Sequence, residues 1–282
     1  MPLDQIDVDE YDAQMTFIEH LEALRWHLVR AIIAIGVGAI FSFIKGKFIF
    51  DTILLGPTRN TFYTFQKLCD LSHRLYDSDR LCVDSMGFVV KTVNIQEQFY
   101  QHFMIAIIGG LIIAMPYVLY EIYRFVKPAL KSKEKKYSSL VIAFASLLFF
   151  LGIGFGYFIL TPISVNFLGT YSLSDDIARE FTVASVVSFI SLLTLGSGVL
   201  FELPIVIYFL AKIGLLTADM MRSYRRIAVV VILIISALIT PPDVTSQIIL
   251  SFPILILYEI GIIIAKKVAP EPITIEEDDE QD

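Results

Sequence analysis

Long apolar runs, separated by shorter charged connections, dominate the chain. Because backbone polar groups in lipid must be satisfied within the segment, apolar runs of about 20 residues are typical of transmembrane helices. The pattern therefore predicts an all-α integral membrane protein with six transmembrane helices. These helices are expected at residues 26–44, 98–120, 181–211, 227–242 and 244–265, with a further helix of about 24 residues that begins at 137.

The last two predicted helices are short. The fifth run, 227–242, has 16 residues. At about 1.5 Å per residue it reaches roughly 24 Å, which is less than a hydrocarbon core of about 30 Å. The sixth run is interrupted by Glu259. We therefore expect local thinning of the bilayer around this pair.

The distribution of Lys and Arg predicts the orientation. Six basic residues lie between the second and third runs, only Arg179 lies between the third and fourth, and none lies between the fifth and sixth. Because short cytoplasmic connections carry the excess of Lys and Arg, both termini are expected on the cytoplasmic side, N-in and C-in. The transmembrane domain then covers residues 26–265, with a long outer connection at 45–98.

Both ends of the chain are predicted to be cytoplasmic segments. Residues 1–25 open with several carboxylates, the opposite of the basic start of a signal peptide, so no cleavage is expected. Residues 266–282 carry seven acidic residues after Lys267, which account for the net charge of −7. This composition indicates a solvated, disordered tail.

Composition excludes several classes of protein. Only 18% of the residues are charged and the mean hydropathy is +0.69, whereas about a quarter of the residues of a soluble domain are charged. An ordinary soluble protein is therefore excluded, and the chain has no overall basic field for nucleic acid. The two cysteines form no CxxC motif and no Cys/His cluster of metal-ligand spacing, so neither a metal site nor a cofactor is expected.

The outer connection has an organisation of its own. Residues 45–55 alternate basic ends with an apolar stretch, so they are expected to lie along the membrane interface until Gly56-Pro57 ends them. Cys69 and Cys82, thirteen residues apart, both fall on the oxidising side of the predicted topology. The sequence is equally compatible with a disulfide between Cys69 and Cys82 and with two free thiols.

Two carboxylates precede the first apolar run. Thr16 and Glu19 have the spacing of a capping box, followed by a helical run. On one interpretation Glu19 only caps this helix. On the other, Glu19 and Glu22 form an acidic rim at the cytoplasmic side.

Glu134 is a carboxylate embedded in the basic connection after the second run. Considered alone, it is a solvated partner for a neighbouring lysine, and such an exposed pair contributes little to stability. Phe125 and Pro128, which precede it, are explained equally well as the residues that end the second helix.

Glu202 differs from these residues because it lies deep inside an otherwise uncharged run. An acid within the membrane is energetically costly and marks a functional site, a water-filled recess or a polar contact between helices. The functional interpretation is favoured here. Pro204 removes a helix hydrogen bond, so a kink is expected beside Glu202.

Three classes of function remain: a protein-translocating receptor, a small-solute transporter and a membrane enzyme. The enzyme is the weakest, because the chain has no GxSxG, no HExxH and no paired intramembrane Asp motif. The alternative to a receptor is a proton-coupled secondary transporter in which Glu202 and Glu259 carry protons.

An ordered set of segments resembles the TatC subunit of the twin-arginine protein translocase. The set covers residues 17–265, and its order makes it far more specific than any one segment. The segments are FIEHLEALRWHL at 17–28, MPYVLYEIYRFVKPAL at 115–130, FFLGIGFGYFILTP at 149–162, GVLFELPIVI at 198–207 and LITPPDVTSQ at 238–247.

The resemblance implies that cytoplasmic carboxylates bind the Arg-Arg of a signal peptide. Glu134 matches the carboxylate of the first cytoplasmic loop, and Phe125 and Pro128 match positions upstream of it. A guanidinium pairs bidentately with a carboxylate, so lysine would fit less well. One position departs from the family, because Ala23 stands where a second glutamate is usual. Glu19, one helical turn earlier on the same face and helped by Glu22, is expected to supply that charge.

The resemblance also implies a concave helical bundle in the cell inner membrane, with export driven by the proton-motive force. Glu202 matches a buried glutamate of the fourth helix, and Pro57 and Asp243 match outer-loop positions needed for assembly and transport. The fifth and sixth helices, including Thr240 and Gln247, are expected to dock single-span subunits of the TatA and TatB type. Self-association in a receptor complex is expected too.

Overall fold

The structure is a computed structural model that describes residues 17–76, 82–83, 86–126, 138–174, 176, 178–241 and 243–268. Nearly all of its regular structure is helical, as the sequence predicts. Five helical stretches in the described part are long and apolar enough to cross a membrane. They are Glu22–Ile44, Glu97–Val126, Ser139–Thr170, Val183–Lys212 and Val244–Val268.

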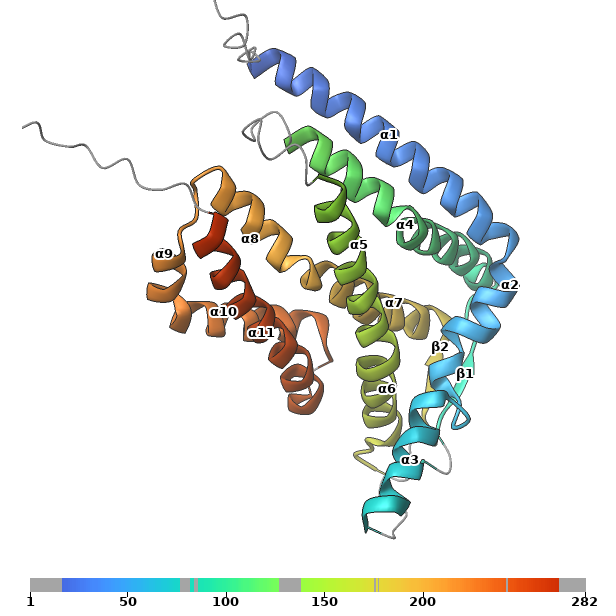
Figure 1. The fold of residues 1–282 in the computed structure, drawn as a ribbon. Helices are drawn as coiled ribbons and strands as arrows, with labels where there is room; N and C mark the ends of the chain where they lie inside the picture. The colour runs from blue at the N-terminus through green and yellow to red at the C-terminus, as the bar shows by residue number, and fades with distance from the viewer. Residues whose placement is uncertain are drawn as a thin grey trace, which may run out of the picture.

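The helices form two groups that diverge from a central pair (Figure 1). α1 and α4 run side by side in one group, and α8, α10 and α11 pack together in the other. α5 and α7 lie between the groups and pack on each other. The bounds are α1 (Phe17–Ile44), α4 (Glu97–Val126), α5 (Ser138–Phe155), α7 (Val183–Phe201), α8 (Leu203–Lys212), α9 (Ala218–Ser223), α10 (Arg225–Ile239) and α11 (Val244–Val268).

The fifth apolar helix is short, as predicted, but the sixth is not. α10 has 15 residues, whereas α11 has 25 and continues past Glu259 to the basic pair at its end. The prediction of a short sixth helix treated Glu259 as an interruption. In the structure Glu259 is about half-exposed and accepts a hydrogen bond from Arg225 at 2.8 Å, so the helix has no reason to end there.

The third apolar helix is longer than the 24 residues expected. α5 continues through a π-helical segment, η6 (Gly156–Leu160), into α6 (Thr161–Thr170). Pro162 occupies the first turn of α6, where its missing N–H costs least. Residues 161–170, beyond the end of the expected helix, are therefore helical as well.

Small side chains bring α1 and α4 into close contact. A Cβ added at Gly38 would lie 2.8 Å from the carbonyl oxygen of Gly110, and one added at Gly110 would lie 2.5 Å from the amide nitrogen of Ala39. A Cβ at Gly109 would likewise lie 2.6 Å from the Ser42 hydroxyl. Helices in lipid associate through such small-residue faces, because lipid supplies no hydrophobic force between them.

The kink predicted near Pro204 is confirmed. α7 ends at Phe201, Glu202 forms the turn, and α8 begins at Leu203 with Pro204 in its first turn. Since Pro204 has no N–H to donate, the break costs little hydrogen bonding.

The outer connection folds against the ends of the long helices. Its helical pieces are α2 (Gly46–Phe48), η2 (Ile49–Leu54), η3 (Gly56–Thr58) and α3 (Tyr63–Tyr76). Tyr157 of η6 donates a hydrogen bond to the carbonyl of Ile53 at 2.7 Å, and Thr64 donates one to Phe158 at 2.5 Å. These bonds fix the connection to the middle of the third span.

A two-stranded parallel sheet and a carboxylate complete this end of the molecule. β1 (Val89–Lys91) pairs with β2 (Glu180–Thr182), and Lys91 forms an ion pair with Glu180. Glu97 is buried and accepts hydrogen bonds from the amides of Val93 and Ala184 at 2.9 and 2.8 Å. It thereby ties the start of α4 to the start of α7.

The open question about the cysteines is settled, because Cys69 and Cys82 form a disulfide. Of the terminal segments predicted at 1–25 and 266–282, residues 1–16, with Thr16, and 269–282 lie outside the described residues, whereas 17–25 and 266–268 are helical.

Candidate functional site

The start of α1 and the end of α4 lie at the same end of the molecule (Figure 1). Between them is a buried polar cluster. His27 of α1 donates through Nδ1 to Glu121 Oε2 of α4 at 2.5 Å, and the Tyr117 hydroxyl hydrogen-bonds the same carboxylate. Arg30 approaches within 4.0 Å of it. Only 2% of the Glu121 side chain is exposed, so the carboxylate is desolvated and depends on these partners.

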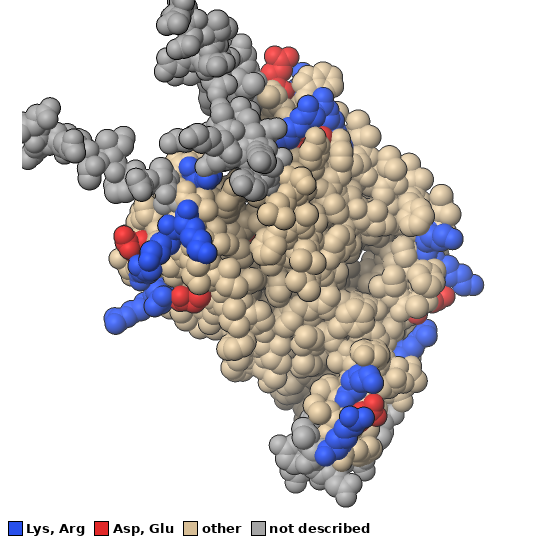
Figure 2. All heavy atoms as spheres, viewed as in Figure 1, with Lys and Arg blue, Asp and Glu red and all other residues tan. Residues whose placement is uncertain are grey.

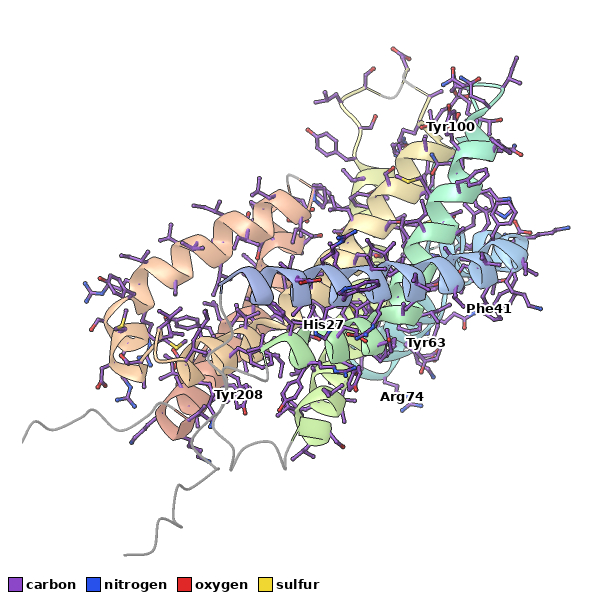
Figure 3. All side chains as sticks on the ribbon, turned by 90° about the horizontal axis from the view of Figure 1, so that it is seen from above. His27, Phe41, Tyr63, Arg74, Tyr100 and Tyr208 are labelled. Carbon is purple, nitrogen blue, oxygen red and sulfur yellow. A yellow bond between two sulfur atoms is a disulfide. The ribbon has the colours of Figure 1, made fainter. Side chains whose placement is uncertain are left out.

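Phe125 forms one wall of this cluster. Its ring centroid lies 6.2 Å from that of His27, in an edge-to-face arrangement. Figure 3 shows His27 on α1 close to α4 when the molecule is seen from above. The cluster therefore fixes the position of α1 relative to the last turns of α4.

The other predicted signal-binding residues are only partly described. α1 is helical from Phe17, so Glu19 and Ala23 lie one turn apart on a continuous helix, but the Glu19 side chain lies outside the description. Glu22 is described and exposed. Glu134 and Pro128 lie in the part of the chain that the structure does not describe.

Sequence reasoning missed Glu121. It stands directly after the expected end of the second helix, at residue 120, and was counted as flanking sequence. A signal was present, since Gly110, Ala114 and Glu121 follow one another at helical spacing. The face that carries the small residues toward α1 therefore also carries this carboxylate.

Glu202 is buried, with 7% of the residue exposed. Neither of its carboxylate oxygens has a hydrogen-bond partner among the described residues. Within the described residues, Glu202 therefore forms no polar contact between helices. Glu259, its partner in the transporter alternative, forms an exposed ion pair with Arg225 instead.

The outer-loop residues have clear local roles. Pro57 is fully buried in η3. Asp243 accepts a hydrogen bond from the amide of Ser246 at 2.6 Å and so caps the start of α11. Its other carboxylate oxygen, Oδ1, is buried without a partner in the described part of the chain.

Thr240 caps the end of α10, and Gln247 joins α11 to α10. The Thr240 hydroxyl donates to the carbonyl of Ser236 at 2.8 Å, and the Gln247 amide donates to the carbonyl of Leu233 at 3.1 Å. Both side chains are thus partnered within the protein. Exposed apolar residues of this pair of helices include Ile227, Val230, Ile234, Leu238 and Ile248.

The disulfide has a histidine beside it that the sequence did not bring forward. His73 Nε2 lies 3.8 Å from Cys82 Sγ, and the ligand atoms of Cys69, His73 and Cys82 lie within 4.8 Å of one another. The disulfide occupies both sulfurs, so the three residues as they stand do not offer two thiolates to a metal ion.

Charged side chains gather at the margins of the molecule. Figure 2 shows Lys and Arg at opposite margins, with a broad uncharged surface between them. The long apolar helices beneath that surface expose many large hydrophobic side chains, which water would disfavour and lipid accepts. The described residues also include a polar cluster at one end and a buried acid, Glu202, without a hydrogen-bond partner among them. Together these features define a multi-pass helical membrane protein.

Comparison with known proteins identifies the family. Residues 19–253 match the family described as "Sec-independent protein translocase protein (TatC)". The chain belongs to the TatC family, so it is a non-enzymatic subunit of a protein translocase and a multi-pass protein of the inner membrane.

Individual relatives agree over most of the chain. The TatC protein of Blattabacterium sp. subsp. Periplaneta americana is 37% identical over 255 residues, which are 89% of this chain and 95% of that protein. The TatC protein of Aquifex aeolicus is 32% identical over 253 residues, 89% of this chain and 95% of that protein. A crystal structure described as the twin arginine translocase receptor TatC in DDM superposes with a TM-score of 0.69 at 32% identity, covering 88% of this chain and 99% of that one.

Proposed function

We propose that this chain is the core receptor of the twin-arginine translocase, which binds Arg-Arg signal peptides of folded proteins on the cytoplasmic side. It spans the membrane six times, N-in and C-in, and nucleates export driven by the proton-motive force. Membership of the TatC family and the likeness to crystal structures described as receptors support this role. The positive-inside distribution of Lys and Arg supports the orientation.

The observation that carries the proposal is the cluster of His27, Glu121 and Phe125. It holds the first turns of α1, with Glu22, beside the last turns of α4, from which the connection with Glu134 leaves. Glu22 is thereby held at the end of the molecule where the described part of α4 ends, and we assign Glu134 as the second carboxylate of the site. Two carboxylates on two elements match two successive guanidinium groups, because each accepts a bidentate pair.

The remaining predicted residues take supporting roles. Glu202 polarises the membrane-facing interior, while Pro57 and Asp243 fix the outer loops on which assembly depends. Single-span subunits of the TatA and TatB type dock on α10 and α11. Gln247 holds these two helices in register, Thr240 fixes the end of α10, and the exposed apolar side chains near them supply the contact. Copies of the chain associate in the receptor complex.

Photo-crosslinking from a position close to Glu134 tests the proposal. A photoreactive residue replaces Ser132, two residues before Glu134, in the full chain in membranes, so that the Glu134 carboxylate is kept, and an Arg-Arg signal peptide is added. We expect a crosslink that an excess of unlabelled Arg-Arg peptide abolishes and a Lys-Lys peptide does not. The control places the photoreactive residue at Ser223, an exposed position of α9 that lies on another connection. Equal crosslinking from both positions would reject position 134 as the binding site.

A further inference from the structure

A pocket of about 620 Å³ opens where α1 ends and α4 begins, away from the His27–Glu121 cluster. Its walls come from α2, η2, β1, α4 and the first residue of α7. This volume falls within the range of about 300–1,000 Å³ that is common for small-molecule sites. Nothing in the proposed receptor role uses it.

One side of the pocket is basic. Lys47, Lys91 and His102 line it, and no Asp or Glu is among the lining residues. Lys91 is already paired with Glu180. Lys47 is exposed and forms no ion pair with any described carboxylate, so its charge is available to a ligand.

The opposite side of the pocket is apolar. Phe50, Leu55, Ile105 and Val183 line it, and Ile105 and Val183 belong to a buried hydrophobic cluster. The pocket therefore joins a cationic rim to an apolar floor. A ligand that fits both halves has an anionic group at one end and hydrocarbon at the other.

His102 is held in place on the rim. Its Nε2 donates to the carbonyl of Phe43 at 3.0 Å, and its ring stacks on that of Phe43 with centroids 4.0 Å apart. A Cβ at position 46 would collide with the imidazole, so Gly46 is required for this arrangement. Because Nε2 carries the proton donated to Phe43, Nδ1 of the neutral ring is an acceptor, so Lys47 supplies the positive charge for an anionic ligand and His102 shapes the rim.

Aromatic side chains place the pocket at the edge of the membrane. Phe43, Phe48, Phe99, Tyr100 and Phe103 are all exposed, and they surround the end of α1 and the start of α4. Among these, Tyr100 is of the type, Trp or Tyr, that is enriched at the interface between hydrocarbon and headgroups, and the Phe rings beside it face the hydrocarbon. In Figure 3, Phe41 and Tyr100 lie toward this end of the molecule, away from His27.

We propose that this pocket binds one anionic glycerophospholipid of the surrounding leaflet. The lipid phosphate lies on the rim beside Lys47 and His102, and the ester ends of the acyl chains lie on the apolar floor. Its site is at the headgroup level, which a lipid reaches by lateral diffusion without leaving the bilayer. The inference is independent of the proposed receptor function, because it uses only the pocket and its position at the membrane edge.

Native mass spectrometry of the purified full chain tests this site. The delipidated protein in detergent is titrated with phosphatidylglycerol, and separately with phosphatidylcholine of the same acyl chains. We expect one phosphatidylglycerol to bind before any others, and phosphatidylcholine to bind more weakly. Lys47→Gln should weaken this first binding step about fivefold, the contribution of one lysine near an anionic lipid surface.

Two further variants keep the test specific. Lys45→Gln removes an exposed charge two residues away that does not line the pocket, and it should leave the first binding step unchanged. Thr92→Trp fills the exposed rim, so it should abolish the first step without lowering the thermal stability of the lipid-free protein. Equal loss in Lys45→Gln, equal binding of phosphatidylcholine, or displacement of the lipid by millimolar inorganic phosphate would each overturn the proposal.

Discussion

At the scale of single residues, Glu121 and Glu202 are both buried acids in apolar helices, but their surroundings are opposite. Glu121 has His27, Tyr117 and Arg30 as partners, whereas neither oxygen of Glu202 has a partner in the described part of the chain. Removing one member of a buried pair leaves the others uncompensated, whereas removing an unpaired acid relieves a cost. The two glutamates should therefore respond differently to neutral substitution.

Glu202→Leu should leave the thermal stability of the protein in detergent unchanged or raise it, while lowering export in cells. The reason is that Leu removes a desolvated carboxylate without breaking a hydrogen bond. Glu121→Leu is the contrasting variant, and it should lower the melting temperature because it strands Arg30 and His27. A large loss of stability in Glu202→Leu would show that Glu202 has a structural partner instead.

A second prediction at this scale concerns the departure at Ala23. If Glu19 replaces the usual carboxylate from one turn earlier, Glu19→Ala should weaken binding of an Arg-Arg peptide by about 1.5–3 kcal/mol, the worth of a hydrogen bond to a charged group. Ala23→Glu in that background should restore binding, since both positions share a helix face. Titration calorimetry measures both.

The Glu22→Ala variant supplies the control for this experiment. We expect it to have the smaller effect, because Glu22 lies about 100° around the helix from position 23, where the usual carboxylate stands. If Glu22→Ala weakens binding and Glu19→Ala does not, the assignment to Glu19 is wrong. If neither matters, Glu19 is only a helix cap.

At the scale of elements, the contact between α1 and α4 depends on the absence of side chains. Gly110→Ala would bring a methyl group within 2.5 Å of the backbone of Ala39, so the helices must separate. We expect a loss of about 1–3 kcal/mol, as for other overpacked sites, and weaker Arg-Arg binding because the His27–Glu121 pair is pulled apart.

Gly36→Ala is a matched control on α1, because a Cβ there meets nothing within 4 Å. It should leave both thermal stability and peptide binding as they are. If Gly36→Ala and Gly110→Ala destabilise the protein equally, the effect comes from the backbone conformation of glycine. Close packing of α1 on α4 would then not be the cause.

The sequence predicts which elements exist better than where they end. Apolar length located the spans, and Pro204 located the break after α7, because each effect is local. The second predicted helix stops before Glu121 and the sixth was treated as interrupted at Glu259, yet α4 and α11 continue through these residues. A charged residue marks the point where lipid gives way to a polar environment. A helix, by contrast, ends only where its backbone hydrogen bonds end.

Contacts between residues far apart along the chain could not be predicted from the sequence. The partner of Glu121 is 94 residues away, and the Cys69–Cys82 disulfide depends on how the chain turns between them. By contrast, the charge pattern needed no partner, and it gave an orientation that is still a prediction.

At the scale of the whole molecule, the two ends are secured by different means. The disulfide, the β1–β2 pair and the Glu97 hydrogen bonds hold one end, and the His27–Glu121 pair holds the other. A disulfide persists in an oxidising compartment. The chemistry that secures each end therefore agrees with the N-in, C-in orientation, in which Cys69 and Cys82 face outward.

Cysteine labelling in intact cells tests this orientation. Cys69 and Cys82 are the two cysteines of the chain, so Cys82→Ser leaves a single thiol at Cys69. A membrane-impermeant maleimide should label Cys69 in intact cells. In a variant with both cysteines replaced by serine and Ser223→Cys added, labelling should require permeabilisation, because exposed Ser223 lies on a predicted cytoplasmic connection. The reverse pattern would invert the topology and move the Arg-Arg site to the outer side, which would exclude the proposed receptor function.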